Sequence, residues 1–347
     1  MAEINLYRAR PRLIREFVID ALVAGLVPFI QSSPGMGKSA IIKSIAKELN
    51  LKLIDHRLST SPPEDLSGLP RFNDKGQAVF APFAELFPIQ GTKIPDGYNG
   101  WLLFLDEFNS AKKDTQAAAY KLILDRCVGQ APLHEHCIVA CAGNLSTDRA
   151  IVNPLSTAMQ SRVIHLEMEI SQEDWLYDVA FAEDYDPRII AYLSQYPDRL
   201  MDFRPDHKDR TFCCPRTWEF MNRLIKNQSV TDQKVPLYAG TITSGVAADF
   251  VQFSKVYKDM PKVSEIMANP AGYPVPTDIS TRWAIVTALL QHTTVDNLDK
   301  INLYIKKFDL SFRVLFFRGV MAKVPDARHC KAFTEAMIEL QRYLRGD

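Results

Sequence analysis

A short glycine-containing segment between an apolar run and a helical pattern constrains this chain more than any other feature. Val27 to Ile30 is apolar, and apolar residues recur at helical spacing from Lys38 to Leu49. The segment that joins them reads SSPGMGKS over residues 32–39, which is the pattern G-x-x-x-x-G-K-[ST] with Ser32 in place of the first glycine. Small residues in such a loop let backbone N–H groups converge on phosphate oxygens at the positive end of a helix.

The sequence therefore predicts a phosphate-binding loop. Lys38 would reach the β- and γ-phosphates, and the Ser39 hydroxyl would be a ligand of Mg²⁺. The residues expected to line the phosphate site are Ser33, Pro34, Gly35, Met36, Gly37, Lys38, Ser39 and Ala40.

A second motif with the same chemistry follows later in the chain. Trp101 to Leu105 is apolar and ends in Asp106 and Glu107, 68 residues after Lys38 in the case of Asp106. At the carboxyl end of a strand beside the phosphate loop, Asp106 could hold Mg²⁺ through water, and Glu107 could polarise an attacking water.

The order of strand, turn and helix recurs through the first half of the chain. The apolar runs 102–105 and 138–141 do not alternate with polar residues, as is typical of strands covered on both faces. This favours a parallel sheet between helices, whereas a mainly helical pattern begins near residue 171. We expect an α/β core over residues 1–169, with a β-hairpin at about 69–83, and a helical region over residues 170–347. Strands are expected at 27–30, 53–58, 101–108, 137–141 and 163–168.

Charge, apolar runs and cysteines narrow the function classes. The chain has 41 basic and 41 acidic residues, of which residues 1–169 carry 18 of each and the rest 23 of each. Neither half has the positive excess of a general nucleic-acid binder. The longest apolar run, Ala21 to Ile30, is ten residues against the roughly 20 that span a bilayer. Six scattered cysteines suit reduced thiols, so we expect a cytoplasmic protein without membrane segments.

Longer stretches of the sequence resemble a known family. The stretches LDEFNSAKKDTQAAAYKLILDR (105–126) and CAGNLSTDRAIVNPLSTAMQSRVIHLEME (141–169) are similar to AAA+ ATPases of the MoxR-like group, which is close to the dynein-related AAA ATPases. PRTWEF (215–220) and GVAADFVQF (245–253) resemble the lid of that family. The resemblance implies a phosphate-loop NTPase core with a five-stranded parallel sheet, followed by an all-helical lid and a C-terminal helical extension.

The resemblance also implies roles for residues outside the two motifs. Asn144 matches the polar sensor that positions the attacking water. Arg162 matches the arginine finger that reaches the nucleotide of a neighbouring subunit, although Arg126 and Arg149 lie close enough in the sequence to compete for this role. Arg216 matches the second sensor arginine, and whether it acts on its own or its neighbour's nucleotide stays open.

The resemblance implies a function as well. The expected activity is binding and hydrolysis of Mg·ATP by a ring, most simply a hexamer, that remodels a protein partner. In this family the partner typically carries a von Willebrand A domain, and no specific nucleic-acid binding is expected. A nucleic-acid motor or loader shares all these motifs and is one alternative. An ATP-dependent assembly scaffold that seldom hydrolyses ATP is the other, although the presence of Glu107, Asn144 and Arg162 argues against it.

Overall fold

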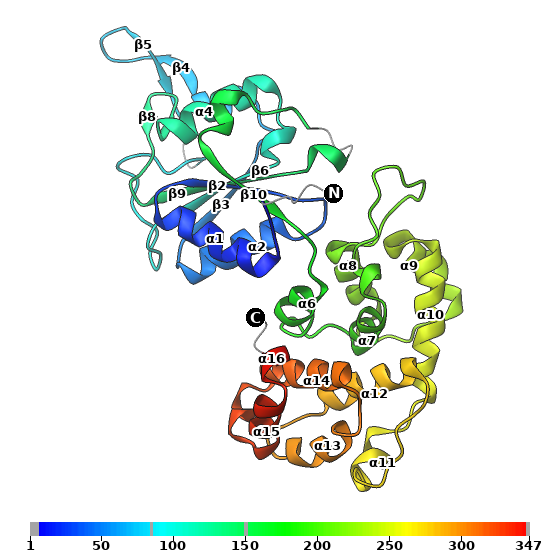
Figure 1. Cartoon of the computed structure of the whole chain (residues 1–347). Coiled ribbons are helices and arrows are strands. Elements are labelled where there is room, and N and C mark those ends of the chain that lie inside the picture. The colour runs from blue at the N-terminus through cyan, green and yellow to red at the C-terminus, as the bar shows by residue number, and fades with distance from the viewer. Residues whose placement is uncertain (1–6, 84–85, 149–151, 345–347) are drawn as a thin grey trace, which may run out of the picture. The chain divides into compact units, whose positions relative to one another are not determined.

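The computed structural model describes residues 7–83, 86–148 and 152–344, and the chain forms two compact units. The first unit is Met1–Ile170 together with Arg204–Asp206. The second unit is Ser171–Phe203 together with His207–Asp347. The large sheet belongs to the first unit, whereas the second is built from helices (Figure 1).

A parallel sheet of six strands forms the centre of the first unit, in the order β1-β10-β2-β9-β6-β3. Five of these strands are those expected from the sequence. The additional strand β1 pairs in parallel with β10, Arg8 opposite Glu167, and has only two residues, too few for any sequence pattern to reveal it. The strands are β1 (Arg8–Ala9), β2 (Val27–Gln31), β3 (Lys52–Arg57), β6 (Trp101–Asp106), β9 (Cys137–Gly143) and β10 (Val163–Met168).

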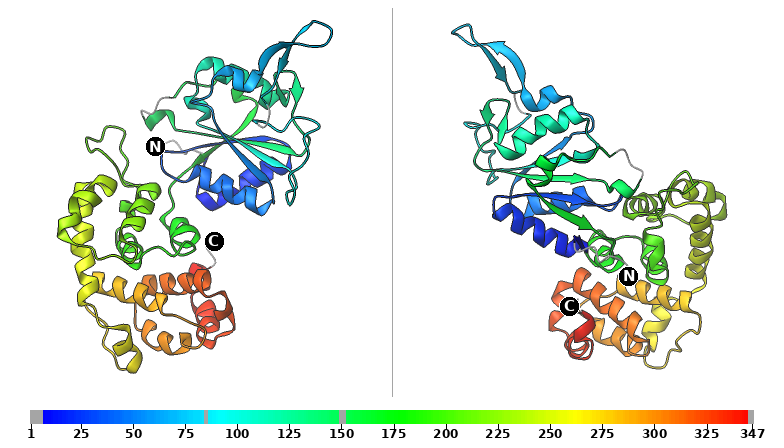
Figure 2. Two further views of the ribbon diagram at one scale, coloured as in Figure 1. Left: turned by 180° about the vertical axis from the view of Figure 1, so that it is seen from behind. Right: turned by 45° about the horizontal axis from the view of Figure 1, so that its top comes forward.

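Helices cover both faces of this sheet (Figure 2). On one face, α1 (Pro11–Val23) and α2 (Lys38–Glu48) pack their apolar side chains against those of β2, β6 and β9. On the other face lie α3 (Pro63–Ser67), α4 (Lys113–Leu124) and α5 (Thr157–Gln160). Every residue of β6 is buried, which confirms that its continuous apolar run reflects a strand covered on both sides.

The carboxyl ends of the parallel strands meet at one edge of the sheet. Since β2, β9, β6 and β3 are neighbours in that order, the loops that follow them are also neighbours. Residues 32–37, 144–148, 107–112 and 58–62 are thereby brought together, although they are spread over more than 100 positions of the chain.

Two small antiparallel hairpins complete the first unit. The expected hairpin consists of β4 (Leu69–Phe72) and β5 (Ala78–Ala81), and it projects from the rest of the unit (Figure 1). The Asn73 side chain shapes its turn, since Oδ1 accepts the backbone N–H of Lys75 at 3.0 Å and of Gln77 at 2.9 Å. The second hairpin is β7 (Cys127–Val128) with β8 (Ala131–Pro132).

The second unit contains eleven α-helices among its described residues, packed around one apolar core. They are α6 (Gln172–Trp175), α7 (Pro187–Gln195), α8 (Pro215–Ile225), α9 (Val235–Ile242), α10 (Ser244–Asp259), α11 (Val263–Ala268), α12 (Ile279–Gln291), α13 (Leu298–Ile305), α14 (Leu310–Lys323), α15 (Lys331–Glu339) and α16 (Gln341–Leu344). Within the described ranges, no helix is both long and apolar enough to cross a bilayer.

The sequence pattern from Ala239 to Lys258 predicts one continuous helix, and this prediction is wrong. The chain breaks at Thr243, whose φ is +73°, between α9 and α10. The preceding carbonyls are bonded from another segment: Thr211 Oγ1 donates to Thr241 O, and Cys213 Sγ donates to Ile242 O, both at 3.0 Å. Because these acceptors are already satisfied, the helix can end there without leaving them buried and unpaired.

Candidate functional site

The loop between β2 and α2 has the backbone of a phosphate cradle. Gly35 and Gly37 adopt φ values of +79° and +94°, a region that glycine enters without the steric cost other residues meet. Gly37 caps α2 without a side-chain acceptor for the first N–H groups of that helix. These N–H groups and the helix dipole therefore favour an anion at this end of α2.

The Lys38 side chain folds back over this loop and is largely buried. Its Nζ donates to Ser32 O at 2.9 Å, to Ser32 Oγ at 3.1 Å and to Ser33 O at 3.3 Å. It also donates to Asn144 Oδ1 at 3.3 Å, so residues 106 positions apart meet at the end of the sheet. The structure thus brings Lys38 and Asn144 into direct contact.

Ser39 and Asp106 supply two oxygen atoms suited to a hard cation. Ser39 Oγ donates to Asp106 Oδ2 at 3.2 Å, and the other carboxylate oxygen of Asp106 accepts the N–H of Glu107 at 2.8 Å. Oxygen ligands from one or two side chains, completed by water and phosphate, are typical of Mg²⁺ in nucleotide sites. The residues present therefore fit the expected metal.

The electrostatics of the neighbouring strand agree with a cation at this place. Asp55 lies on β3, and partial burial together with the nearby Asp106 carboxylate raises the pKa of Asp55 above its ordinary value of 3.8. A divalent ion beside Asp106 would favour the ionised form of Asp55.

Glu107 is held at the edge of the site by residues that follow β3. Its carboxylate accepts a hydrogen bond from Ser59 Oγ and lies 3.5 Å from Arg57 Nε. Glu107 itself has a φ of +55°, and its side chain is about one third exposed, at 37%. In this arrangement the carboxylate is available to solvent but oriented by two partners.

Neither Arg57 nor Ser59 was expected at the site. Both lie where β3 ends, and they reach Glu107 because β3 pairs with β6 in a register that places Arg57 opposite Asp106. Pairing between strands this far apart in the chain leaves no local pattern in the sequence.

The three candidate finger arginines differ in their surroundings. Arg162 is exposed after α5, donates to Ser161 Oγ, and lies with its guanidinium carbon 5.9 Å from the centroid of the Tyr120 ring. Arg126 instead donates to Cys137 O, a carbonyl of the sheet. Arg149 lies outside the described residues.

Arg216 belongs to the second unit. It is exposed and is the second residue of α8, directly after Pro215, which suits the first turn of a helix.

The first unit is thus a parallel α/β sheet with a phosphate-type loop and an oxygen-ligand pair at its carboxyl edge.

No protein-family model matches the chain, and no curated protein matches it. Among solved structures it is similar to the Holliday junction branch migration motor RuvB of Thermotoga maritima, at 16% identity and a TM-score of 0.36, covering 85% of this chain and 87% of that one. It is also similar to a putative ATPase from Cytophaga hutchinsonii, at 15% identity and a TM-score of 0.34, covering 97% and 89%.

Proposed function

We propose that this protein binds Mg·ATP at the loop of residues 32–39 and hydrolyses it. The observation that carries the proposal is the convergence of Lys38, Ser39, Asp106 and Asn144 through side-chain hydrogen bonds at one edge of the sheet. Each of these residue types has a separate task in phosphoryl transfer.

Each side chain has a task that its position supports. The loop N–H groups bind phosphate oxygens, and Lys38 exchanges its contacts with Ser32 and Ser33 for the β- and γ-phosphates. Ser39 and Asp106 would hold Mg²⁺, which when bound would neutralise charge on the phosphates. Glu107 accepts the proton of the attacking water, and Asn144 orients that water.

Lys38 Nζ donates several hydrogen bonds to neutral oxygens, which a phosphate can replace. The acceptors described for Lys38 Nζ are three oxygens of Ser32 and Ser33 and the amide oxygen of Asn144, none of them charged. A phosphate oxygen is a stronger acceptor for an ammonium group than any of them. ATP is thus expected to release the Asn144 side chain at the moment when the γ-phosphate arrives.

We further propose that the protein is a MoxR-like AAA+ ATPase that works as a ring, most simply a hexamer, on a protein client. The sequence resemblance and the exposed position of Arg162 support this, because an arginine that completes a neighbour's site has to be presented at the surface. The resemblance favours a client with a von Willebrand A domain.

The first experiment measures phosphate release by the wild-type protein with ATP, with GTP, and with ATP in excess EDTA. Turnover that needs both ATP and Mg²⁺ supports the proposal. Turnover that persists in EDTA, or no ATP binding at millimolar concentration, contradicts it.

The second experiment tests the shared site. Arg162→Ala should bind ATP normally but lose turnover on the order of 10³-fold, the scale of an arginine finger. Mixing it with Lys38→Ala should restore part of the activity, because an intact Lys38 site can then face an intact Arg162. Arg126→Ala and Arg149→Ala serve as comparison variants. If one of them, and not Arg162→Ala, loses turnover and regains it on mixing with Lys38→Ala, then that residue is the arginine finger.

The third experiment identifies the client. Glu107→Gln with ATP should retain a protein partner in a pull-down, beside binding assays with duplex and single-stranded DNA over a salt series. Sub-micromolar DNA binding at about 150 mM salt, or ATPase stimulation by DNA alone, would favour a nucleic-acid motor instead.

A further inference from the structure

Asn109 is a buried side chain at the site that none of the proposed steps uses. It lies in the single turn Phe108–Ser110 that follows β6, three residues after Asp106, and only 3% of it is exposed. Its side chain makes two hydrogen bonds with one residue: Oδ1 accepts the backbone N–H of Asn144 at 3.1 Å, and Nδ2 donates to the backbone O of Asn144 at 2.7 Å.

This pair of bonds fixes the backbone of Asn144 from both sides. An amide side chain that satisfies both the N–H and the C=O of a single residue leaves that residue little freedom to rotate about its φ and ψ angles. The Asn144 side chain points its Oδ1 at Lys38 Nζ, which donates to it at 3.3 Å.

The residue before Asn144 adapts to this arrangement. A Cβ atom on Gly143 would lie 2.1 Å from Asn109 Oδ1, far inside contact distance, so only glycine lets the Asn109 amide approach. Gly143 O also accepts the N–H of Ser32 at 3.4 Å, which links the same peptide to the start of the phosphate loop.

Asn109 is itself anchored by its backbone. Its carbonyl accepts the N–H of Asn153 at 2.7 Å, and the turn that contains it begins directly after Glu107. Asn109 therefore joins the segment that carries Glu107 to the segment that carries Asn144, which belong to neighbouring strands of the sheet.

We infer that Asn109 is a positioning residue for hydrolysis: it holds the Asn144 backbone so that the Asn144 side chain and the Glu107 carboxylate address the same water. The inference rests on the proposed ATPase function. Asn109 touches neither phosphate nor metal in this arrangement, so it acts on the chemical step through Asn144 and not on nucleotide binding.

The test compares three variants with the wild type for ATP affinity, kcat, KM and thermal unfolding. Asn109→Ala removes both bonds to Asn144. Asn109→Asp keeps the size and the acceptor but places a carboxyl oxygen against Asn144 O where the donor was, and thermal unfolding reports any loss of folding separately. Asn153→Ala is the matched control, since the Asn153 side chain donates to Ala111 O at 2.8 Å and its backbone bond to Asn109 survives the substitution.

Turnover is normalised to the number of sites that bind ATP, so that partial unfolding does not imitate a catalytic loss. For Asn109→Ala and Asn109→Asp we expect kcat to fall on the order of 10-fold or more, the scale of a misplaced catalytic group, while KM and ATP affinity change less than about threefold. Asn153→Ala should keep its normalised kcat even if its thermal stability falls.

Two different results would overturn two different statements. If the wild-type protein binds ATP but does not hydrolyse it, the proposed function fails. If the wild type hydrolyses ATP and Asn109→Asp keeps normalised kcat within twofold, or if Asn153→Ala loses as much as Asn109→Ala, the role assigned to Asn109 is wrong while the ATPase proposal stands.

Discussion

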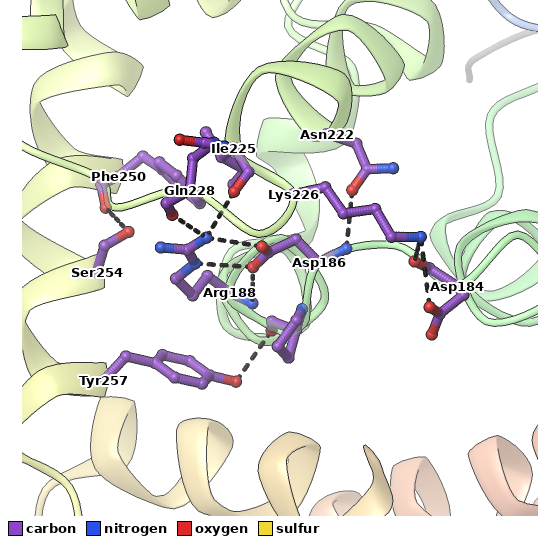
Figure 3. A network of polar contacts seen from close by, with 11 residues as sticks. Asp184, Asp186, Arg188, Asn222, Ile225, Lys226, Gln228, Phe250, Ser254 and Tyr257 are labelled. Atoms are coloured by element: carbon purple, nitrogen blue, oxygen red, sulfur yellow. Dashed lines mark hydrogen bonds and ion pairs between the residues drawn. The ribbon is translucent and has the colours of Figure 1, made fainter.

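The two units each contain a largely buried cation with several hydrogen bonds, yet the two cations are used in different ways. In the helical unit, Arg188 forms a bidentate pair with Asp186, Nε to Oδ1 at 2.8 Å and Nη2 to Oδ2 at 2.7 Å (Figure 3). Nη2 also donates to the carbonyls of Ile225 and Gln228, both at 2.9 Å, which ties the start of α7 to the end of α8. This network is closed, because charge and hydrogen bonds are satisfied within the unit.

The Lys38 cluster of the first unit is arranged otherwise. Its described acceptors are neutral oxygens, three of them from the loop that the lysine itself follows. An anion of higher charge can replace such acceptors. It would gain little at an arginine whose charge and hydrogen bonds a fixed carboxylate already satisfies. Burial of a charged group therefore does not mark a functional site; the kind of partner decides whether a ligand can compete.

The largest expected effect is a loss of stability when the network of Arg188 and Asp186 is broken. Arg188→Ala leaves the Asp186 carboxylate buried without its partner, so the free energy of unfolding should fall by about 3–5 kcal/mol. Urea unfolding measures this. Arg223→Ala is the control, since Arg223 forms an exposed pair with Glu219 within α8 and should cost less than about 1 kcal/mol. Equal losses in the two variants would show that the Arg188 pair is no more important than a surface pair.

Removing the cation of the Lys38 cluster should weaken nucleotide binding and leave the stability of the fold nearly unchanged. Lys38→Ala removes charged hydrogen bonds to phosphate, so ATP affinity should fall on the order of 10²- to 10³-fold. Its thermal unfolding temperature should stay close to that of the wild type. Lys47→Ala, an exposed lysine of the same helix, is the matched control for nucleotide titration. A Lys38→Ala protein that binds ATP normally would place the phosphates elsewhere.

A substitution of Glu107 should distinguish nucleotide binding from the chemical step. Glu107→Gln should keep ATP affinity but lose turnover on the order of 10²-fold, because an amide cannot accept the proton of the attacking water. Phosphate release under saturating ATP measures this, with the exposed Glu135→Gln as control. Unchanged turnover would remove Glu107 from the catalytic role.

The smallest expected effect is on stability, and it concerns the exposed ion pairs of Asp184. Asp184 is exposed on the helical unit and pairs with Lys323 at 2.7 Å and Lys226 at 3.3 Å, and these bonds hold the pKa of Asp184 below its ordinary value of 3.8. A carboxyl that is more acidic in the folded state stabilises the fold above its ordinary pKa and loses this contribution as the pH falls through the folded pKa. Solvent screening limits the contribution to less than about 1 kcal/mol.

Asp184→Asn is a suitable variant because asparagine tolerates the φ of +52° found at this position. The variant should be slightly less stable than the wild type at pH 7, and the difference should shrink as the pH falls below the ordinary pKa of 3.8. A difference that stays constant over that fall in pH would have to come from packing and not from the ion pairs.

Local sequence patterns predicted many of this protein's structural elements. The glycine-containing loop between β2 and α2, the strand that ends at Asp106 and the hairpin around Asn73 each depend on contiguous residues, and the sequence predicted all three elements. The loop conformation follows from Gly35 and Gly37, whose positive φ values need no help from elsewhere in the chain. The helical character of the second half was likewise visible, since its helices keep their apolar residues at helical spacing.

Other features arose only from contacts between distant segments. The sequence did not predict that Ser59 and Arg57 hold Glu107, because this depends on β3 pairing with β6. It did not predict the break at Thr243, because the carbonyls freed there are bonded from Thr211 and Cys213, some 30 residues earlier.

By itself, the sequence determined which residues could cradle phosphate, ligate Mg²⁺ and accept a proton, since those capacities belong to side-chain chemistry and to short-range backbone geometry. Tertiary structure alone decided which of them meet. Strand order at the carboxyl edge places Asn144 against Lys38, and the Asn109 amide fixes Asn144 through two bonds that span 35 positions of the chain. The physical reason is that a hydrogen bond between distant segments depends on the order and register of strands, which the whole core specifies and no single segment encodes.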